Sequence, residues 1–563
     1  MNDGVSEIDD ENFFLSKDGV SDAQSELLAT LDAFYSDKKK DDNSSICRYP
    51  ARYRWLSDEL NATDFPKANC AEYNKIKNRV DPKSVTYVFP SAHINSPASM
   101  FGHTFLRINS SYNSKLLSYA VNYSANADAD TTNGVVFALK GLFGGYFGQY
   151  SLLPYYDKLK EYRDSEQRDI WEYDLNLTQD ETLRMFEHIW ELNNIHSYYY
   201  FFTENCSYNM LWLLEIARPS LHLREHFTYQ VSPLETIKVA NDEKLIVDTN
   251  YRASKRTVLL KYEELLDEKY ISYPVEIVDT NLSINIAIKD ANITQQMYIL
   301  ESSIEYLEYQ YGKNNINKDR YIDLFHKLTI KRAKLGIGKD IDVKIPPNPL
   351  HSHRAARVML GAGSRDGELI SYIGVRPVYH DLEDSSYGFL RGTQIEFLNI
   401  LASYSDDDIN LEELTVVSIV SIAQRSEFFK SFSWRTKLGW DRDLFDDKTN
   451  FSTSVGAGYS WGNKYGYFYM MLEPIIYFNK NFDAAICGSL GLNIDKYTLT
   501  STNIEATQRF YANGQEQLLL NISEGFRTSQ NTQIMLKYEY KDRYIHNKNT
   551  KEDTFVGFFK WYF

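Results

Sequence analysis

The stretch "TFVGFFKWYF", residues 554–563, decides the fold of the last third of this chain. Phe555, Phe559, Trp561 and Phe563 all stand at alternate positions of it. A period of two is the signature of a β-strand, because successive side chains point to opposite faces of a sheet. A long alternating strand with an aromatic face and a closing aromatic residue is typical of an outer-membrane barrel.

The same period runs through the sequence from about residue 354 onward. "SFSWRTKLGW" (431–440) and "TQIMLKYEY" (532–540) are two clear examples among about twelve such segments. We therefore predict an approximately 12-stranded antiparallel transmembrane β-barrel over residues 354–563. A soluble β-sandwich also has alternating strands, but they are usually shorter. No window of the sequence offers the roughly 18 apolar residues of a spanning helix, and a barrel needs none.

Upstream of the barrel, strand and helix patterns are mixed, which predicts an α+β fold. "SVTYVFPS" (84–91) and "QRDIWEYDLNL" (167–177) favour strands. Residues 177–194 favour a helix that opens with a capping box of Thr178 and Glu181, and a second helix is expected over 205–217. The predicted parts are an N-terminal helical segment over 1–83, a catalytic domain over 84–250, a helical region and linker over 251–353, and the barrel over 354–563.

Composition narrows the compartment and the partners. The chain has 563 residues and a formal net charge of -16, so its general surface is unsuited to nucleic acid. The opening "MNDGVSEIDDENFF" is acidic, unlike a secretory signal. The protein is then either cytosolic or a mature exported form with an added methionine, and the barrel favours the second. We expect an outer-membrane protein with a periplasmic N-terminal part.

Four cysteines occur, and they favour different roles. Cys47 and Cys70 lie in a stretch punctuated by Pro and Asn, and in an oxidising compartment we expect them to form a disulfide. Two buried free thiols are the alternative. Cys487 falls in a predicted strand, where we expect an inert packing residue.

The fourth cysteine, Cys206, lies in "YFFTENCSYNM" (200–210). It directly follows a Thr-Glu-Asn turn signal and begins a predicted helix. The free N–H groups and dipole of a helix N-terminus stabilise a thiolate, so Cys206 is a candidate nucleophile. His103 lies in "INSPASMFGHTFLRI" (94–108) and could act as its base if folding unites them. From spacing alone, two buried structural residues are the favoured interpretation.

These two motifs, with "GLFGGYFGQYSLLPYYDKLKEYRDSEQRDIWEY" (141–173) between them, resemble the Lnb family, whose named member is a lipoprotein N-acyltransferase. The resemblance implies a permuted papain-like (NlpC/P60-type) periplasmic domain. It further implies Cys206 as the nucleophile and His103 as the general base and acid. A third polar residue would orient the imidazole; we choose Asn122, with Asn95 and Ser99 as alternatives.

The backbone N–H of Cys206 or Ser207 could hold the oxyanion, and Glu204 and Asn205 are expected to be helix caps rather than catalysts. We expect no cofactor and no metal site. His351 and His353, in the linker, are interpreted as part of a solvated loop rather than as metal ligands.

The resemblance implies an outer-membrane-anchored periplasmic cysteine acyltransferase or hydrolase. It would act through a thioester on a lipid, lipoprotein or cell-wall acyl group. The alternative is a non-catalytic barrel protein whose periplasmic domain binds a partner or peptidoglycan. A pore is a third possibility, although twelve strands would enclose a narrow lumen filled with side chains. We expect a monomer.

Overall fold

The computed structural model describes residues 4–61, 65–92, 102–112, 114–126, 140–141, 144–442, 448–478, 482–495, 499–545 and 548–563. The chain forms two compact units. The first comprises Met1–Ser91 and Gly102–Ser254, and the second comprises Ala92–Phe101 and Lys255–Phe563.

The first unit opens with short helices that are tied together covalently. The predicted disulfide between Cys47 and Cys70 is present, and it joins α2 to the residue that precedes α4. Arg52 in α3 donates its backbone N–H to Glu191 of α7 at 2.9 Å, which attaches the helices to the rest of the unit. The elements are η1 (Glu11–Phe13), α1 (Ala23–Ser36), α2 (Ser45–Arg48), α3 (Pro50–Leu60) and α4 (Ala71–Val80).

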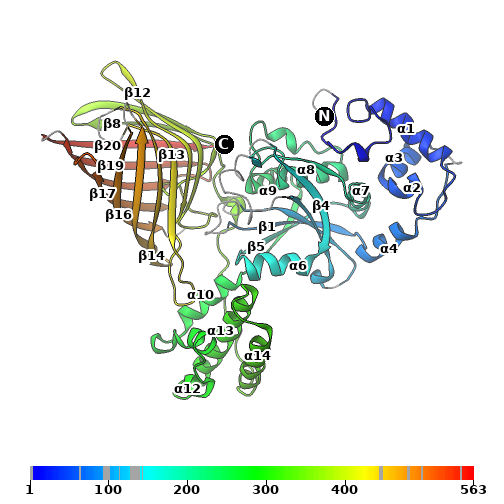
Figure 1. Ribbon diagram of the computed structural model, residues 1–563, viewed down its shortest axis with the longest axis horizontal. Coiled ribbons are helices and arrows are strands. Elements are labelled where there is room, and N and C mark those ends of the chain that lie inside the picture. The colour runs from blue at the N-terminus through cyan, green and yellow to red at the C-terminus, as the bar shows by residue number, and fades with distance from the viewer. Residues whose placement is uncertain are drawn as a thin grey trace. The chain divides into compact units, whose positions relative to one another are not determined.

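A seven-stranded antiparallel sheet forms the middle of the first unit (Figure 1). Its strand order is β6-β4-β3-β2-β1-β5-β7, so neighbouring strands in space are often far apart in sequence. The strands are β1 (Ser84–Pro90), β2 (Phe105–Asn109), β3 (Tyr119–Ala125), β4 (Tyr146–Pro154), β5 (Ile170–Leu175), β6 (His196–Tyr199) and β7 (Ile246–Arg252).

Both faces of the central strands are buried, because different helices cover them. On one face Phe105 packs with Tyr155 and Tyr162 from the α6–η4 segment. Thr104, one position earlier and so on the other face, hydrogen-bonds to Ser207 of α8. The predicted capping box of α7, made by Thr178 and Glu181, is confirmed. The helices are η3 (Lys115–Leu117), α6 (Tyr155–Leu159), η4 (Lys160–Ser165), α7 (Gln179–Glu191), α8 (Cys206–Ala217), η5 (Arg224–His226) and α9 (Pro233–Asp242).

The second unit begins with a helical bundle, as the sequence predicts. Its core combines aliphatic and tyrosine side chains and receives Phe428 and Phe429 from the loop that follows β12, which joins the bundle to the barrel. The helices are α10 (Lys255–Leu265), η6 (Glu268–Tyr270), α11 (Tyr273–Asp279), α12 (Ile284–Ile288), α13 (Ile293–Gly312), α14 (Lys318–Ala333) and η7 (Pro349–His351).

The remainder of the second unit is a closed β-barrel of twelve antiparallel strands (Figure 1). β20 pairs with both β19 and β8, which closes the cylinder. β9 and β10 both pair with β11 and flank Pro377, so they form one interrupted strand; proline has no N–H to give to the ladder. The segments are β8 (Arg357–Arg365), β9 (Glu368–Arg376), β10 (Val378–His380), β11 (Thr393–Ser405), β12 (Asp408–Ser421), β13 (Ser433–Asp441), β14 (Asn450–Asn463), β15 (Gly466–Phe478), β16 (Phe482–Asp495), β17 (Thr500–Tyr511), β18 (Glu516–Arg527), β19 (Thr532–Ile545) and β20 (Lys548–Tyr562).

The outer face of the barrel wall is apolar, and its inner face carries both polar and apolar side chains. In β15, exposed and buried residues alternate from Tyr467 to Phe478, with Phe468 and Leu472 pointing outward and Glu473 pointing inward. An apolar outer surface on a closed cylinder is what a lipid bilayer requires of a spanning β structure. None of the helices in the described ranges is long and apolar enough to cross a membrane.

Candidate active site

Cys206 is the first residue of α8, and a dedicated cap holds that helix end. Asn205 Oδ1 accepts the backbone N–H groups of Ser207 at 2.9 Å and Tyr208 at 3.2 Å. Its Nδ2 group donates to the carbonyl oxygens of residues 201 and 231, so both ends of the amide are fixed. The expected capping role of Asn205 is confirmed, and the cap puts Cys206 at the positive end of the helix dipole.

The structure brings His103 and Asn122 into direct contact. His103 immediately precedes Thr104 and the strand β2, and Asn122 lies in the neighbouring strand β3. The imidazole Nε2 lies 2.8 Å from Asn122 Oδ1 and donates its N–H to that oxygen, which leaves Nδ1 for another partner. The ring stacks on Tyr162 at a centroid distance of 5.6 Å. Strand pairing and ring packing therefore hold the imidazole in one orientation.

Cys206 Sγ is the second partner of the imidazole. The sulfur hydrogen-bonds to the His103 side chain and to the backbone N–H of Thr104, and it lies 3.7 Å from Ser207 Oγ. Burial alone would raise the pKa of this thiol, but the charge of His103 and these hydrogen bonds outweigh it and lower the pKa to about 7. Burial likewise opposes protonation of His103, yet the thiolate and Asn122 raise its pKa. The favoured state is an imidazolium–thiolate pair.

The Cys206 backbone N–H contacts Tyr199, a residue that no sequence pattern selects. It donates to Tyr199 Oη at 3.2 Å, and the same hydroxyl contacts the sulfur. Burial, and then the charge of Cys206, raise the pKa of Tyr199 well above its ordinary value, so its O–H stays protonated. The run of tyrosines at 198–200, just before the cysteine, is the only sequence signal for it.

The other expected site residues fall in different places. Both expected oxyanion donors have partners: the Ser207 N–H donates to the Asn205 cap, and the Cys206 N–H donates to Tyr199 Oη. Asn95 and Ser99 lie outside the described residues. Glu204 does not form the cap, which Asn205 provides; burial raises the Glu204 pKa to about 6.

A second tyrosine hydroxyl in this neighbourhood is buried. Tyr123 lies one position after Asn122 in β3 and is 2% exposed, and its ring stacks on Tyr199 at 5.8 Å. Among the described residues its Oη has no hydrogen-bond partner. The ring rests on Gly148 of β4, where any Cβ would lie 2.3 Å from the hydroxyl. A buried hydroxyl without a partner is uncommon, and it marks a place where a ligand could bind.

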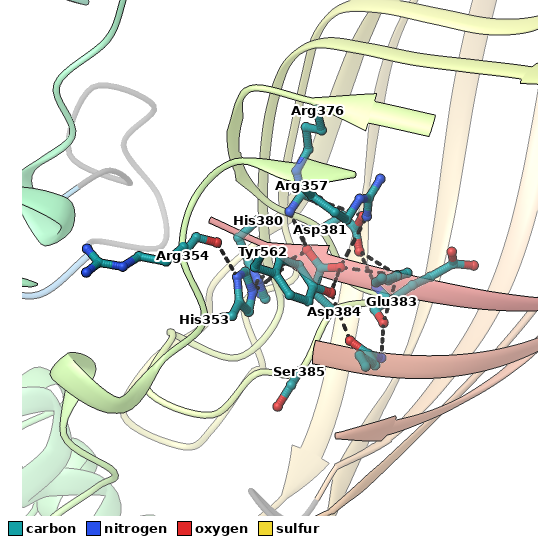
Figure 2. Close-up of polar contacts among 12 residues, drawn as sticks. His353, Arg354, Arg357, Arg376, His380, Asp381, Glu383, Asp384, Ser385 and Tyr562 are labelled. Atoms are coloured by element: carbon teal, nitrogen blue, oxygen red, sulfur yellow. Dashed lines mark hydrogen bonds and ion pairs between the residues drawn. The ribbon is translucent and has the colours of Figure 1, made fainter. Parts of the chain in front are cut away.

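In the second unit, His353, His380 and Asp384 bring three possible metal-ligating atoms together (Figure 2). His353 is 3% exposed, so its expected place in a solvated loop is wrong. Its Nδ1 donates to the carbonyl of Arg354 at 2.6 Å, and its Nε2 lies 3.1 Å from His380 Nδ1. The Asp384 Oδ2 atom lies 3.8 and 3.9 Å from those two nitrogens.

Asp384 is nevertheless a poor metal ligand, because its oxygens already accept several hydrogen bonds. Oδ2 accepts from Arg376 at 2.6 Å, and Oδ1 accepts from Tyr562 at 2.6 Å. Arg357 and Lys560 each approach Oδ1 at 3.1 Å. A divalent cation would therefore meet three fixed positive charges, and we interpret the group as an ion-paired cluster.

Comparisons with known proteins agree with this organisation. Residues 72–243 match the family model of the Lnb N-terminal periplasmic domain. Three models described only as domains of unknown function match residues 1–59, 249–342 and 346–562. No curated protein matches the sequence.

Solved structures similar to the chain are outer-membrane barrels. The NanC porin is 10% identical with a TM-score of 0.26, and the match covers 37% of this chain and 100% of that one. An outer membrane channel from Pseudomonas putida F1 is 11% identical with a TM-score of 0.25, covering 40% and 100%. OmpT of Vibrio cholerae is 8% identical with a TM-score of 0.19, covering 37% and 96%. Residues 72–243 of the chain are thus similar to the Lnb N-terminal periplasmic domain, and the last part of the chain is a closed twelve-stranded β-barrel.

Proposed function

We propose that this protein is a periplasmic cysteine acyltransferase or hydrolase anchored in the outer membrane. It would act through a thioester on a lipid, lipoprotein or cell-wall acyl group. The observation that carries the proposal is the chain of contacts from Asn122 through the His103 imidazole to the Cys206 sulfur. A nucleophile, a base and a group that orients the base are the three parts of a covalent acyl-transfer site.

The order of these parts supports a permuted papain-like interpretation of the domain. The imidazole and the amide come from the adjacent strands β2 and β3, and the cysteine begins a later helix that packs on them. The Lnb match covers all three residues. In this interpretation Cys206 is the nucleophile, His103 is the general base and acid, and Asn122 is a positioning residue.

The first half-reaction begins with attack of the Cys206 thiolate on an ester or amide carbonyl carbon. A C–S bond forms and the carbonyl electron pair moves to oxygen. The Cys206 N–H and the Tyr199 O–H, which lie 3.2 Å apart between N and Oη, would both turn to that oxyanion. When the intermediate collapses, the leaving-group bond breaks, the His103 imidazolium protonates the departing atom, and a thioester remains.

The second half-reaction releases the acyl group. An amine or water attacks the thioester carbonyl, and neutral His103 takes the proton of the attacking atom. The C–S bond then breaks, which restores the thiolate and the imidazolium. Cys206 is 6% exposed and so shielded from bulk water. The balance between transfer and hydrolysis would therefore depend on which acceptor binds beside it.

The location supports lipid or cell-wall substrates. A barrel of the outer membrane in the same chain would tether the domain on the periplasmic side, the compartment that contains lipoproteins, peptidoglycan and the inner leaflet of the outer membrane. The acyl donor is therefore proposed only as a class.

A thiol-directed activated ester tests the proposal on the full chain in detergent. The wild type should gain one acyl group on Cys206, read by peptide mass spectrometry, and hydroxylamine should remove it. Cys206→Ala should stay unlabelled, whereas Cys487→Ala, which changes a buried barrel cysteine, should label like the wild type. If the wild type stays unlabelled, a non-catalytic binding domain becomes the better account.

A further inference from the structure

One connection of the barrel folds into its lumen instead of turning back at the rim. Residues 381–391 link β10 to β11 at the end where the chain enters β8 and leaves β20, which is the periplasmic end. Asp381 and Asp384 in this segment are 7% and 2% exposed. By contrast, the connection from β14 to β15 at the same end is a two-residue turn.

Ion pairs fix this segment, which we call the inner loop, to one side of the barrel (Figure 2). Asp381 Oδ2 accepts from Arg376 at 2.7 Å and also pairs with Arg357. Lys560 reaches Asp384 at 3.1 Å. These cations come from β9, β8 and β20, which are adjacent strands, and both arginines and the lysine are buried.

Deeper contacts show that the inner loop enters the lumen. The carboxylate of Glu383 pairs with Lys537 of β19 at 3.1 Å, and its carbonyl oxygen accepts from Gln533 at 2.9 Å. Gln533 and Lys537 stand four residues apart and so share one face of the strand, and Lys537 lines the cavity of the lumen, so this face is the inner one. The loop is therefore held by side chains that line the interior, rather than by the rim.

The inner loop also reaches the opposite wall. Arg391 donates to the backbone carbonyl of Asn463, at the end of β14, at 3.1 Å. Asp384 lines a small cavity together with Tyr467 of β15 and Asn493 of β16. In a closed ring of twelve strands, β15 is six positions from β8 and lies diametrically across from it. The loop consequently spans the lumen from wall to wall.

Beyond the loop the lumen contains a polar cavity of about 400 Å³. Leu382 of the inner loop lines this cavity, so the loop borders it. Six cationic and six anionic side chains line it: Arg365, Arg435, Lys437, Arg509, Lys537 and Lys541, with Glu412, Glu413, Asp441, Glu473, Glu505 and Glu539. A lining with equal numbers of each sign gives no strong preference for either ion.

We infer that the barrel is a gated channel for small polar solutes, closed at rest by residues 381–391. The buried ion pairs to Asp381 and Asp384 form the latch. Breaking these ion pairs leaves uncompensated buried charges. Removing the loop should therefore take away most of the free energy that favours the closed state over the open state. The Arg435–Glu505 pair, at 3.2 Å across the cavity, keeps the open path narrow. This inference does not depend on the chemistry at Cys206.

Single-channel recording on the full chain in planar lipid bilayers tests the gate. The wild type should be closed almost all the time. A variant with residues 381–391 replaced by a short Gly-Ser linker should show discrete openings, with an open probability about a hundredfold higher, as expected when buried ion pairs are lost. In a potassium chloride gradient its reversal potential should stay near zero, because the lining is balanced in charge.

A matched control changes another periplasmic turn: Lys464→Gly with Tyr465→Gly should stay closed like the wild type. Folding is checked by the heat-dependent shift in gel mobility that a folded barrel shows. If the loop variant does not fold, Asp384→Asn is the smaller change, and its open probability should also rise. Equal conductance in the wild type and the variants would overturn the inference, since the loop would not be a gate. No conductance in any folded variant would overturn it as well, since the lumen would not be a path.

Discussion

Replacing His103 with alanine should change the ionisation of Cys206 in a direction that the contacts determine. With His103 present, the thiol pKa is lowered from 9.0 to about 7. Two pKa units correspond to about 3 kcal/mol of preference for the thiolate. Removing the imidazole leaves the burial that raises the pKa, so the His103→Ala thiol should titrate at 9 or above. The thiolate fraction at pH 7 should fall from about one half to about 1%.

The alkylation rate at a single pH understates the change in the Cys206 pKa. A thiolate of higher pKa is intrinsically more nucleophilic, by about eightfold for two units, so the rate at pH 7 should fall only about sixfold. The pH midpoint is therefore the quantity to measure. Iodoacetamide alkylation of Cys206, followed by peptide mass spectrometry from pH 5 to 10, gives that midpoint directly.

The control for this experiment is His222→Ala, which removes an exposed histidine of the same unit. Its midpoint should match the wild type near 7. An unchanged midpoint in His103→Ala would refute the reasoning, because the imidazole would then contribute nothing to the thiolate. A wild-type midpoint near 9 would refute it equally.

Three further predictions follow from individual contacts. Asn122→Ala should slow acylation of Cys206 by about ten- to a hundredfold, measured with an activated ester, because a hydrogen bond to the charged His103 ring is lost. Tyr123→Phe should leave the unfolding midpoint of the first unit unchanged or raise its stability by up to about 1 kcal/mol, since the lost hydroxyl has no described partner; a clear loss would contradict this. Reducing the Cys47–Cys70 bond, which closes a separation of 23 residues, should lower stability in urea by about 3 kcal/mol, and an unchanged midpoint would count against that role.

The barrel is the part of the fold that the sequence predicts best. Inward and outward residues of a membrane strand must differ in polarity, so the pattern is written into every strand, as in the alternation of β15 from Tyr467 to Phe478. The inner loop has no comparable pattern in the sequence. Asp381 and Asp384 read as turn residues in sequence, and only their pairing with arginines from other strands makes them interior residues. Local patterns report local structure, and this pairing is not local.

The candidate site also has features that the sequence predicts and features that depend on long-range contacts. A turn signal and a helical run identify Cys206 as a helix start, and the Asn205 cap is a local device that sequence can reveal. The contact between His103 and Asn122 depends on how β2 and β3 pair, about nineteen residues apart in sequence. Tyr199 contacts Cys206 only because β6 ends beside the start of α8. Among three adjacent tyrosines, nothing in the sequence distinguishes the one that points inward.

The central claim is that Cys206 becomes acylated by a component of the outer membrane. The most direct measurement is peptide mass spectrometry of Cys206 after the purified full chain is incubated with outer-membrane lipids and lipoproteins. We predict a fatty-acyl thioester on Cys206 that hydroxylamine releases and that Asn122→Ala forms more slowly. A Cys206 peptide that stays unmodified, in a protein whose thiol titrates near pH 7, would contradict the proposed acyl transfer.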